Sequence, residues 1–239
     1  MNRAVFLAAA ILLLPLPSRG QGASLPRFGV GAKFGTLGIG FEGATVVTER
    51  SNLRFGFNVF DYHQDKTKDG IDYDADLKLR SVQVTYDQYL TRAFHVSPGI
   101  LIYNGNRIDA ATAVGAGESF VLGNTRYFSS QTSPIVGTAE MELRKVAPMV
   151  LIGFGNVLPR SNRRFGVNFD AGVVFQGSPK STLSLTGSAC TVSPTVGCLN
   201  AGTDPTVQSN VRAEQEQLDD DLRRFQFYPV LSIGVSWKF

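Results

Sequence analysis

The chain has 239 residues, a formal net charge of +3 and two cysteines. Without the N-terminal segment described next, 21 basic and 20 acidic residues remain, a balance that argues against a nucleic-acid partner. No later stretch is long and apolar enough for a transmembrane helix, whereas 25 glycines and 17 phenylalanines suit many strands with aromatic exteriors.

The first residues form a candidate export signal. A short positive start, residues 1–3, precedes the apolar run Ala4–Leu16, which is too short to span a bilayer and ends in prolines and small residues. We expect residues 1–23 to be a cleaved signal peptide and residues 24–239 to form one outer-membrane β-barrel domain. Cleavage after Gly20 is nearly as compatible with the sequence, and an uncleaved anchor is the alternative.

The next two stretches have the alternating pattern of strands. Phe28–Val47 has a phase break at Gly35, which predicts a hairpin of two short strands, with a single bulged strand as the alternative. Leu53–Phe60 places apolar side chains on one face and Arg54 and Asn58 on the other. The lumen of a small membrane barrel tolerates such polar residues, whereas the core of a soluble sandwich does not.

A charged ladder marks the fourth expected strand, Ile71–Leu90, in which a change of parity near Ser81 predicts a bulge. The charges that share one face are Asp72, Asp74, Asp76, Lys78 and Arg80. We expect them in the lumen, paired with charges from other strands, because unpaired buried charges are costly. The expected partners are Arg54, Glu140, Glu142 and Arg144. The alternative is a calcium site at the barrel mouth, which loss of stability on chelation would support.

The fifth expected strand, Val96–Asn106, follows the one motif with enzymatic features. His95-x-Ser97, with Asp109 on the same parity, is similar to the constellation of outer-membrane lipid A deacylases, in which serine attacks an ester and histidine takes its proton. The departures are Pro98 directly after the serine, an aspartate in place of glutamate, and an acid that lies far along an extended strand. We therefore expect an interfacial histidine beside a turn, with no catalytic residue and no metal.

Three more strands complete an expected total of eight. Lys145–Asn156 and Phe165–Phe175 are the sixth and seventh, and the latter turns Asn168 and Asp170 inward. The C-terminal strand is the eighth, and the number is even, as in bacterial barrels of this class. Short connections are expected in the periplasm and long ones outside the cell. The short ones cover residues 48–52, 90–94 and 157–164, and the long ones 63–70, 111–139 and 178–224.

The last long connection carries two further predictions. Cys190 and Cys198 are expected to form a disulfide, because an exported chain passes through an oxidising periplasm. Asp204 and Pro205 predict the start of an amphipathic helix over residues 206–224 that caps or lines the outer mouth. Its apolar stripe consists of Val207, Val211, Leu218, Leu222 and Phe225.

The C-terminal strand, Leu231–Phe239, alternates apolar residues with small or polar ones. Its apolar face would contact lipid, with Trp237 and the terminal Phe239 in the interfacial aromatic girdle. The terminal phenylalanine resembles the signal by which bacterial outer-membrane barrels are assembled. We therefore expect the barrel assembly machinery to be a partner.

Four segments, 72–80, 145–148, 175–180 and 227–239, are similar to a family of small Gram-negative outer-membrane barrels. The chain is also similar, more loosely, to the eight-stranded barrels of the outer membrane protein A and W types. The resemblance implies an antiparallel transmembrane β-barrel in the bacterial outer membrane, reached through the periplasm. It implies no activity that could be transferred to particular residues.

Three classes of function are compatible with these observations. The first is a structural or surface-interaction barrel, monomeric, with a largely side-chain-filled lumen and with outer-membrane lipid and lipopolysaccharide as partners. The second is a narrow channel for small polar solutes, favoured by the inward polar residues. The third is a lipid A-modifying hydrolase. None of the three needs a cofactor.

Overall fold

The computed structural model describes residues 28–239 except 69–70 and 161–162, so the expected signal peptide, residues 1–23, lies outside the described residues. The described residues form fifteen strands, helix α1 (Pro205–Leu222) and the 3-10 turn η1 (Arg223–Phe225). None of the described helices is both long and apolar enough to span a membrane. The all-β antiparallel class expected from the sequence is confirmed.

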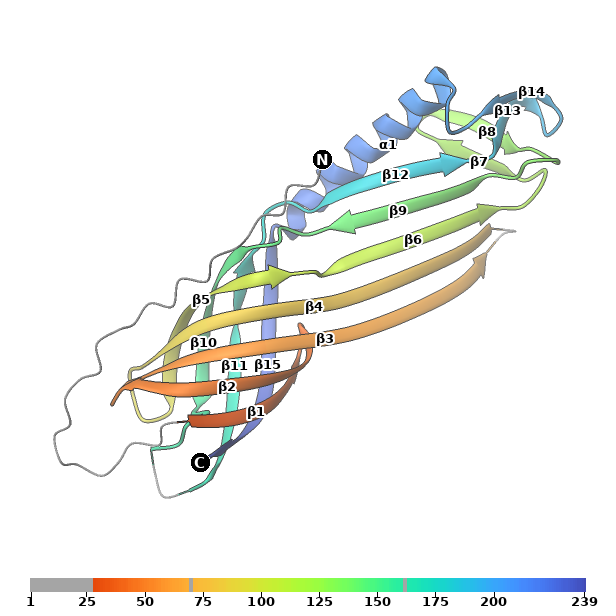
Figure 1. The fold of residues 1–239 in the computed structure, drawn as a ribbon. Coiled ribbons are helices and arrows are strands. Elements are labelled where there is room, and N and C mark those ends of the chain that lie inside the picture. Colours follow the sequence, from red (N-terminus) through yellow and green to blue (C-terminus); the bar gives the residue numbers. More distant parts are fainter. Residues whose placement is uncertain (1–27, 69–70, 161–162) are drawn as a thin grey trace, which may run out of the picture.

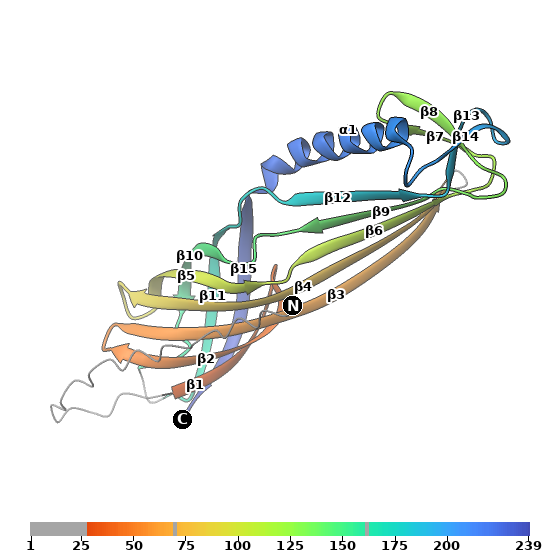
Figure 2. The ribbon, with the colours of Figure 1, turned by 45° about the horizontal axis from the view of Figure 1, so that its top comes forward.

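Eight strands form a closed antiparallel ring, which we call the barrel (Figures 1 and 2). They are β1 (Phe28–Gly35), β2 (Gly38–Thr48), β3 (Ser51–Lys68), β4 (Ile71–Tyr89), β5 (Phe94–Asn104), β10 (Ala147–Gly155), β11 (Phe165–Phe175) and β15 (Phe227–Lys238). Each pairs with the next in this order, and β15 pairs with β1 to close the ring. The expected hairpin at the start of the chain is present as β1 and β2.

Beyond the barrel lies a five-stranded sheet, which we call the distal sheet. It consists of the far halves of β3 and β4 together with β6 (Arg107–Val114), β9 (Val136–Glu142) and β12 (Lys180–Thr186). β3 and β4 contain 18 and 19 residues, about twice what a strand needs to cross a bilayer. β4 changes partner from β5 to β6 between Ser81 and Lys78, so the two sheets are continuous along it. Figure 1 shows this sheet rising from one end of the barrel.

The expected total of eight strands is therefore too low, because the described residues contain fifteen. The eight strands that the sequence predicts are those that form the barrel. The expected long connections, 63–70, 111–139 and 178–224, contain strands of the distal sheet and a smaller sheet. The second and third of these connections are rich in alanine, glycine, serine and threonine and lack the alternation that marks the barrel strands. Within them and just before them, β6, β9 and β12 form strands because each extends the hydrogen-bonded ladder that begins at β4.

A second sheet lies at the far end of the distal sheet. It contains β7 (Ser119–Leu122), β8 (Thr125–Ser129), β13 (Ser188–Ser193) and β14 (Val196–Asn200). Cys190 and Cys198 face each other across β13 and β14 and form the expected disulfide, with an S–S distance of 2.04 Å. Buried residues of this sheet, such as Tyr127 and Ala189, pack with Val207 and Val211 of α1 into one apolar cluster.

Helix α1 begins where the sequence predicts, because the Asp204 carboxylate accepts hydrogen bonds from the backbone N–H groups of Thr206 and Val207 at 2.9 and 3.1 Å. The expected mouth cap is wrong in position: α1 lies along β12 instead (Figure 2). Of the expected apolar stripe, Val207, Val211 and Leu222 are buried, Leu218 is half-buried and Phe225 is exposed.

The helix also covers the outer edge of β12. The Asp219 carboxylate accepts from the Ser181 backbone N–H at 2.8 Å and its hydroxyl at 2.6 Å, and the Gln215 side chain accepts from the Leu183 N–H at 3.2 Å. Unpaired backbone groups of an edge strand invite pairing with another chain. Helix α1 therefore supplies hydrogen-bond acceptors for backbone N–H groups at the edge of β12 that would otherwise be unpaired.

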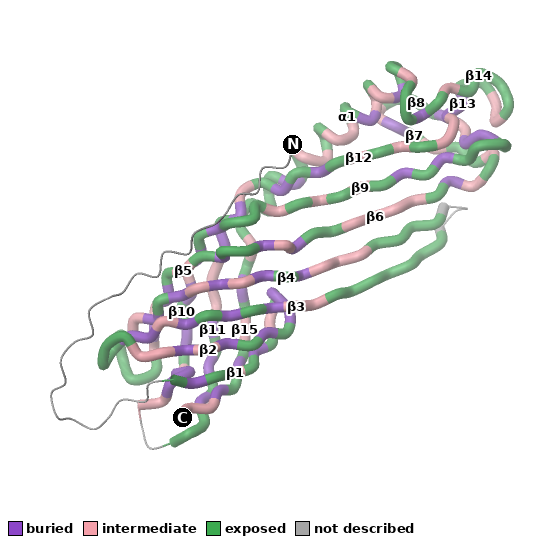
Figure 3. Tube along the Cα trace, in the orientation of Figure 1, coloured by how far each residue is buried: buried purple, intermediate pink, exposed green. Residues whose placement is uncertain are grey.

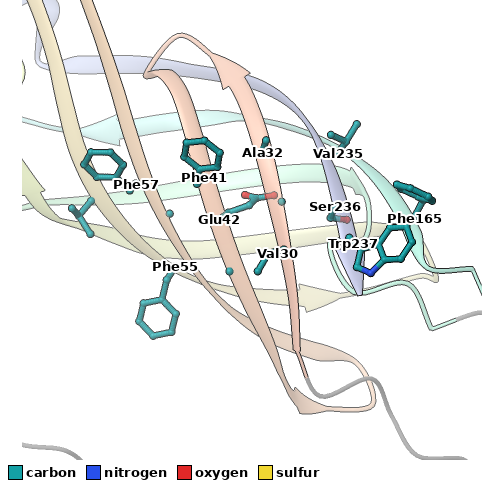
Figure 4. A pocket seen from close by; sticks show the side chains of 14 residues that line it. Val30, Ala32, Phe41, Glu42, Phe55, Phe57, Phe165, Val235, Ser236 and Trp237 are labelled. Atoms are coloured by element: carbon teal, nitrogen blue, oxygen red, sulfur yellow. The ribbon is translucent and has the colours of Figure 1, made fainter. Parts of the chain in front are cut away.

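The outer surface of the barrel is apolar and aromatic. Figure 4 shows aromatic side chains of this surface on neighbouring strands of the barrel, among them Phe41, Phe57 and Trp237. Phe41 is 65% exposed, whereas the adjacent Glu42, on the opposite face of β2, is 3% exposed. Most barrel strands thus turn apolar residues outward and polar residues inward, the reverse of a soluble protein, whereas β10 is apolar on both faces.

This polarity inverts where the strands leave the barrel. Register places Leu77, Ala75 and Tyr73 of β4 on the face that continues the lumen, and Lys78 and Asp76 on the face that continues the apolar outer surface. Figure 3 shows much of the distal sheet exposed, in contrast to the buried rows inside the barrel. The distal sheet is therefore patterned for water on its outer face.

Candidate functional site

The barrel interior holds a buried ionic cluster centred on Arg54 of β3. Its guanidinium donates to Asp170 at 2.7 Å, to Asp87 at 3.0 Å and to Glu42 at 3.4 Å. All four side chains are at most 1% exposed. Buried charges are tolerated only when they are paired and hydrogen-bonded, so these contacts are needed to hold the carboxylates inside.

Further side chains complete the cluster from other strands. Lys33 of β1 lies 3.9 Å from Glu42, and His95 of β5 lies 2.9 Å from Asp170. Asn168 of β11 donates to Asp170 at 3.3 Å. The interior thus places three carboxylates beside one arginine, one lysine and one histidine, drawn from β1, β2, β3, β4, β5 and β11.

Glycine makes room for these long side chains. Gly153 of β10 lies between His95 and Asp170 in the register of three adjacent strands. A Cβ atom at Gly153 would lie 2.5 Å from both Asp170 Oδ1 and His95 Nε2. The histidine and the carboxylate therefore meet across a strand position that must lack a side chain.

Apolar clusters close the interior on both sides of the ionic cluster. On the distal side, Leu37, Leu101, Met149, Val174 and Val230 belong to one buried cluster. At the other end, which carries the β2–β3, β4–β5 and β10–β11 connections and which we call the turn end, Val157 and Leu158 pack on Ala44. The ionic cluster lies between two layers of packed apolar side chains.

Several polar atoms of the interior have no protein partner. They are Glu42 Oε1, Arg54 Nε, Asn58 Oδ1, Asp87 Oδ2, His95 Nδ1, Ser97 Oγ, Asn168 Oδ1 and Ser236 Oγ. Buried polar atoms are nearly always hydrogen-bonded, to ordered water where protein groups do not reach. The interior between the apolar layers is therefore suited to hold water.

The structure brings together four of the sequence-selected lumen residues, Arg54, Asn58, Asn168 and Asp170, each 1% exposed. Sequence reasoning missed Lys33, Glu42, Asp87 and His95 as their partners. Alternation along β2 could have predicted that Glu42 faces the lumen, because Glu42 follows Phe41 and so lies on the opposite face of the strand.

The remaining selected residues lie outside the lumen, and their expected placement there is wrong. They are Asp72, Asp74, Asp76, Lys78, Arg80, Glu140, Glu142 and Arg144. The expected bulge near Ser81 exists as a register shift, but the extra residue is Ile102 on β5, so β4 keeps its alternation. As a result its charges point to the opposite face from Ser81 and Gln83.

These charges do form a ladder, on the outer face of the distal sheet. Lys78 lies 2.9 Å from Asp109, which is 3.1 Å from Arg107, and Arg80 lies 3.5 Å from Asp61. The expected salt bridges thus exist, but they lie on the distal sheet and not in the lumen. Arg54 is not among them, because it belongs to the separate interior cluster.

An exposed histidine extends the acidic end of this ladder. His63 lies 3.0 Å from Asp76, 2.8 Å from Asp65 and 3.6 Å from Asp74. The hydrogen bond that the His63 ring donates to Asp76, followed by the charge of Asp65, raises the pKa of His63 above its usual value. Ligand atoms of His63, Asp74 and Asp76 lie within 4.8 Å of one another, so the expected calcium alternative has a geometric counterpart, with a histidine added.

The structure does not assemble the hydrolase constellation. His95 and Ser97 both face the barrel interior, 1% and 0% exposed, but Asp109 lies in the distal sheet beside Lys78. The acid that meets His95 is Asp170. The pair is enclosed between the two apolar layers, away from the apolar outer surface.

The C-terminal aromatic residues lie where β1, β11 and β15 meet at the turn end. Trp237 pairs with Val30 on one side and Phe165 on the other, and its ring centroid lies 4.4 Å from that of Phe165. The backbone N–H of Phe239 donates to Phe28 at 3.1 Å. The last strand therefore closes the barrel and ends in an aromatic group.

Fold and interior together define a small closed antiparallel β-barrel with a charged, enclosed lumen and a sheet that projects from one end. Comparisons with protein-family models and with curated proteins found no match. Solved structures with the same fold include CarO of Acinetobacter baumannii, with a TM-score of 0.54 and 23% identity over 88% of this chain and 97% of that one. CarO2 of the same organism has a TM-score of 0.57 and 18% identity over 91% and 100%.

Proposed function

We propose that this protein is an integral barrel of the bacterial outer membrane with a structural or surface-interaction role and a closed lumen. The observation that carries the proposal is the buried Arg54 cluster, packed between two apolar layers inside an apolar exterior. The outward aromatic surface is the one that lipid requires. The fold shared with CarO agrees with it.

The orientation follows from the two ends of the barrel. The β2–β3, β4–β5 and β10–β11 connections and Phe239 lie at the turn end, and the long projecting strands lie at the other. The proposal assigns the turn end to the periplasm, because bacterial barrels keep their longer connections outside the cell. The distal sheet, α1 and the disulfide then lie outside the cell, where a disulfide is stable. We propose that the chain is exported through the periplasm, inserted by the barrel assembly machinery, and monomeric.

In this proposal the distal sheet performs the function and the barrel anchors it. Its charged outer face carries both signs, as in the Lys78–Asp109 pair, and would meet lipopolysaccharide and other surface molecules. The proposal assigns no catalytic residue, because His95 and Ser97 are enclosed within the barrel.

Single-channel recording of the refolded protein in a planar bilayer tests the closed lumen. We expect stable insertion without steady conductance, both for the intact protein and after deletion of residues 206–224. Steady openings in the intact protein would overturn the proposal, and openings only after the deletion would show that α1 blocks a pore.

A narrow water-filled path is the second candidate, favoured by the interior polar atoms that have no protein partner. Two apolar residues on the distal side, Leu101 and Met149, are the residues to remove. If Leu101→Ala with Met149→Ala turns a silent barrel into a conducting one, the polar layer is continuous and the apolar layer closes it. If the double variant stays silent, the channel candidate fails.

A further inference from the structure

Arginines from three turns surround a cavity at the turn end of the barrel. The cavity is about 900 Å³ in volume, and its charged lining consists of Glu49, Arg50, Arg92, Arg160 and Arg163. These residues come from the β2–β3, β4–β5 and β10–β11 connections, so the fold, and not a run in the sequence, brings them together. Four cations face one acid, which makes the cavity a candidate anion site.

Arg160 is held in place but not neutralised. Its Nη2 donates to the Thr48 carbonyl at 3.1 Å, the Ser51 carbonyl at 3.3 Å and the Asn52 side chain at 2.8 Å. All three acceptors are uncharged, and Nε and Nη1 are buried without a protein partner. Burial lowers the pKa of Arg160, and the charge of Glu49 opposes this shift. Its guanidinium is held in place at the cavity wall as a fixed positive charge, and the exposed Arg50 and Arg92 offer accessible donors beside it.

The same cavity opens onto the apolar outer surface. Phe165 and Val167 of β11 also line it, and they are 68% and 61% exposed. They stand on the outward face of β11, opposite Gly166 and Asn168. A ligand in this cavity would therefore meet cations at one end and the apolar belt of the barrel at the other.

We propose that this cavity binds the phosphodiester head group of an anionic phospholipid, with an acyl chain along Phe165 and Val167. The proposal rests on the membrane location and orientation given above. Arginine matches phosphate oxygens with several charge-assisted hydrogen bonds. A free phosphate ion shares the head-group chemistry but makes no use of the apolar side, which is why a lipid of the periplasmic leaflet fits better.

The test is native mass spectrometry of the refolded protein released from detergent, titrated with phosphatidylglycerol or phosphatidylcholine. We expect tighter binding of phosphatidylglycerol and a loss of that preference of about tenfold in Arg92→Gln with Arg160→Gln. Because Arg160 also holds backbone carbonyls, Arg50→Gln with Arg92→Gln is the second variant, and it changes exposed turn residues only. Arg223→Gln, on the helix side of the molecule and paired with Asp220, is the matched control.

The outcomes separate this proposal from the proposed function. A preference that survives in both double variants, or that Arg223→Gln removes equally, would overturn the site. Competition by inorganic phosphate without any preference for phosphatidylglycerol would overturn the lipid assignment. Failure to insert into phosphatidylcholine vesicles would contradict the membrane barrel itself, whereas insertion without lipid preference contradicts only the site.

Discussion

The barrel and the distal sheet share β3 and β4, and these two strands have opposite polarity in the two regions. On β4, Val82 and Val84 face outward in the barrel, whereas Lys78 and Asp76 hold that face in the distal sheet. On the other face, buried Gln83 and Asp87 give way to Leu77 and Ala75. The alternation along β4 is unbroken. The type of residue on each face therefore changes with the surroundings of that half of the strand.

An ion pair therefore has a different role in each of the two regions. In the interior, the contacts of Arg54 compensate carboxylates that water cannot reach. In the distal sheet, solvent screens the equivalent pairs, and the sheet is held instead by backbone pairing and by the apolar cluster under α1. Four substitutions would break or sharpen this contrast.

The largest expected effect is that of Arg54→Ala. It leaves Asp170, Asp87 and Glu42 buried without their shared cation, and removal of one partner of a buried pair costs about 3–5 kcal/mol. The matched change in the distal sheet is Arg80→Ala, whose side chain is 54% exposed and which should cost about 0–1 kcal/mol. Urea unfolding in lipid vesicles measures both, and equal losses would refute the contrast.

A smaller loss is expected for Gly153→Ala. The added methyl group enters the space between Asp170 and His95, and such overpacking costs about 1–3 kcal/mol. Gly43→Ala is the control, because its Cβ would face outward with no atom nearer than 3.7 Å. The midpoint of urea unfolding should fall for Gly153→Ala and stay unchanged for Gly43→Ala. A tolerated alanine at Gly153 would show that the histidine and carboxylate need not meet.

Asp219→Ala should loosen the distal sheet without touching the barrel. The Ser181 N–H and hydroxyl lose their acceptor, at a cost of about 1–3 kcal/mol for an unsatisfied buried donor. Hydrogen exchange should rise in β12 and remain unchanged in β11. Asp220→Ala, which removes only an exposed contact with Arg223, is the control and should leave both strands protected.

The smallest expected effect is a pH dependence confined to the distal sheet. Because the folded pKa of His63 is raised, its contribution to stability is fully present below the unfolded pKa and is lost as pH rises through the folded pKa. The protection factors of the amides in the distal half of β3, which correct for the base-catalysed rise of exchange with pH, should therefore fall above the ordinary histidine range. His63→Gln should abolish this change, and a similar change in the barrel half of β3 would contradict its assignment to His63.

The sequence predicts the barrel because its strands carry a period-2 pattern strong enough to read without partners. Phe165–Phe175 and the C-terminal strand show it most clearly. Val96–Asn106 and Lys145–Asn156 lack strict alternation and are predicted from their apolar, glycine-rich composition. The Asp204 cap of α1 and the Cys190–Cys198 disulfide are equally local, since they need only their own segments and the expected compartment.

Only the tertiary structure decided which polar residues share the interior. The register shift near Ser81 falls on β5, at Ile102, so β4 keeps its parity and turns Lys78 and Asp76 away from the lumen face; which of the two strands holds the extra residue cannot be read from β4 alone. Asp170 meets His95 only because β10 places a glycine between them. Alternation sets the two faces of a strand, but register sets which of them is enclosed and with what partners, and register arises only when the sheet closes.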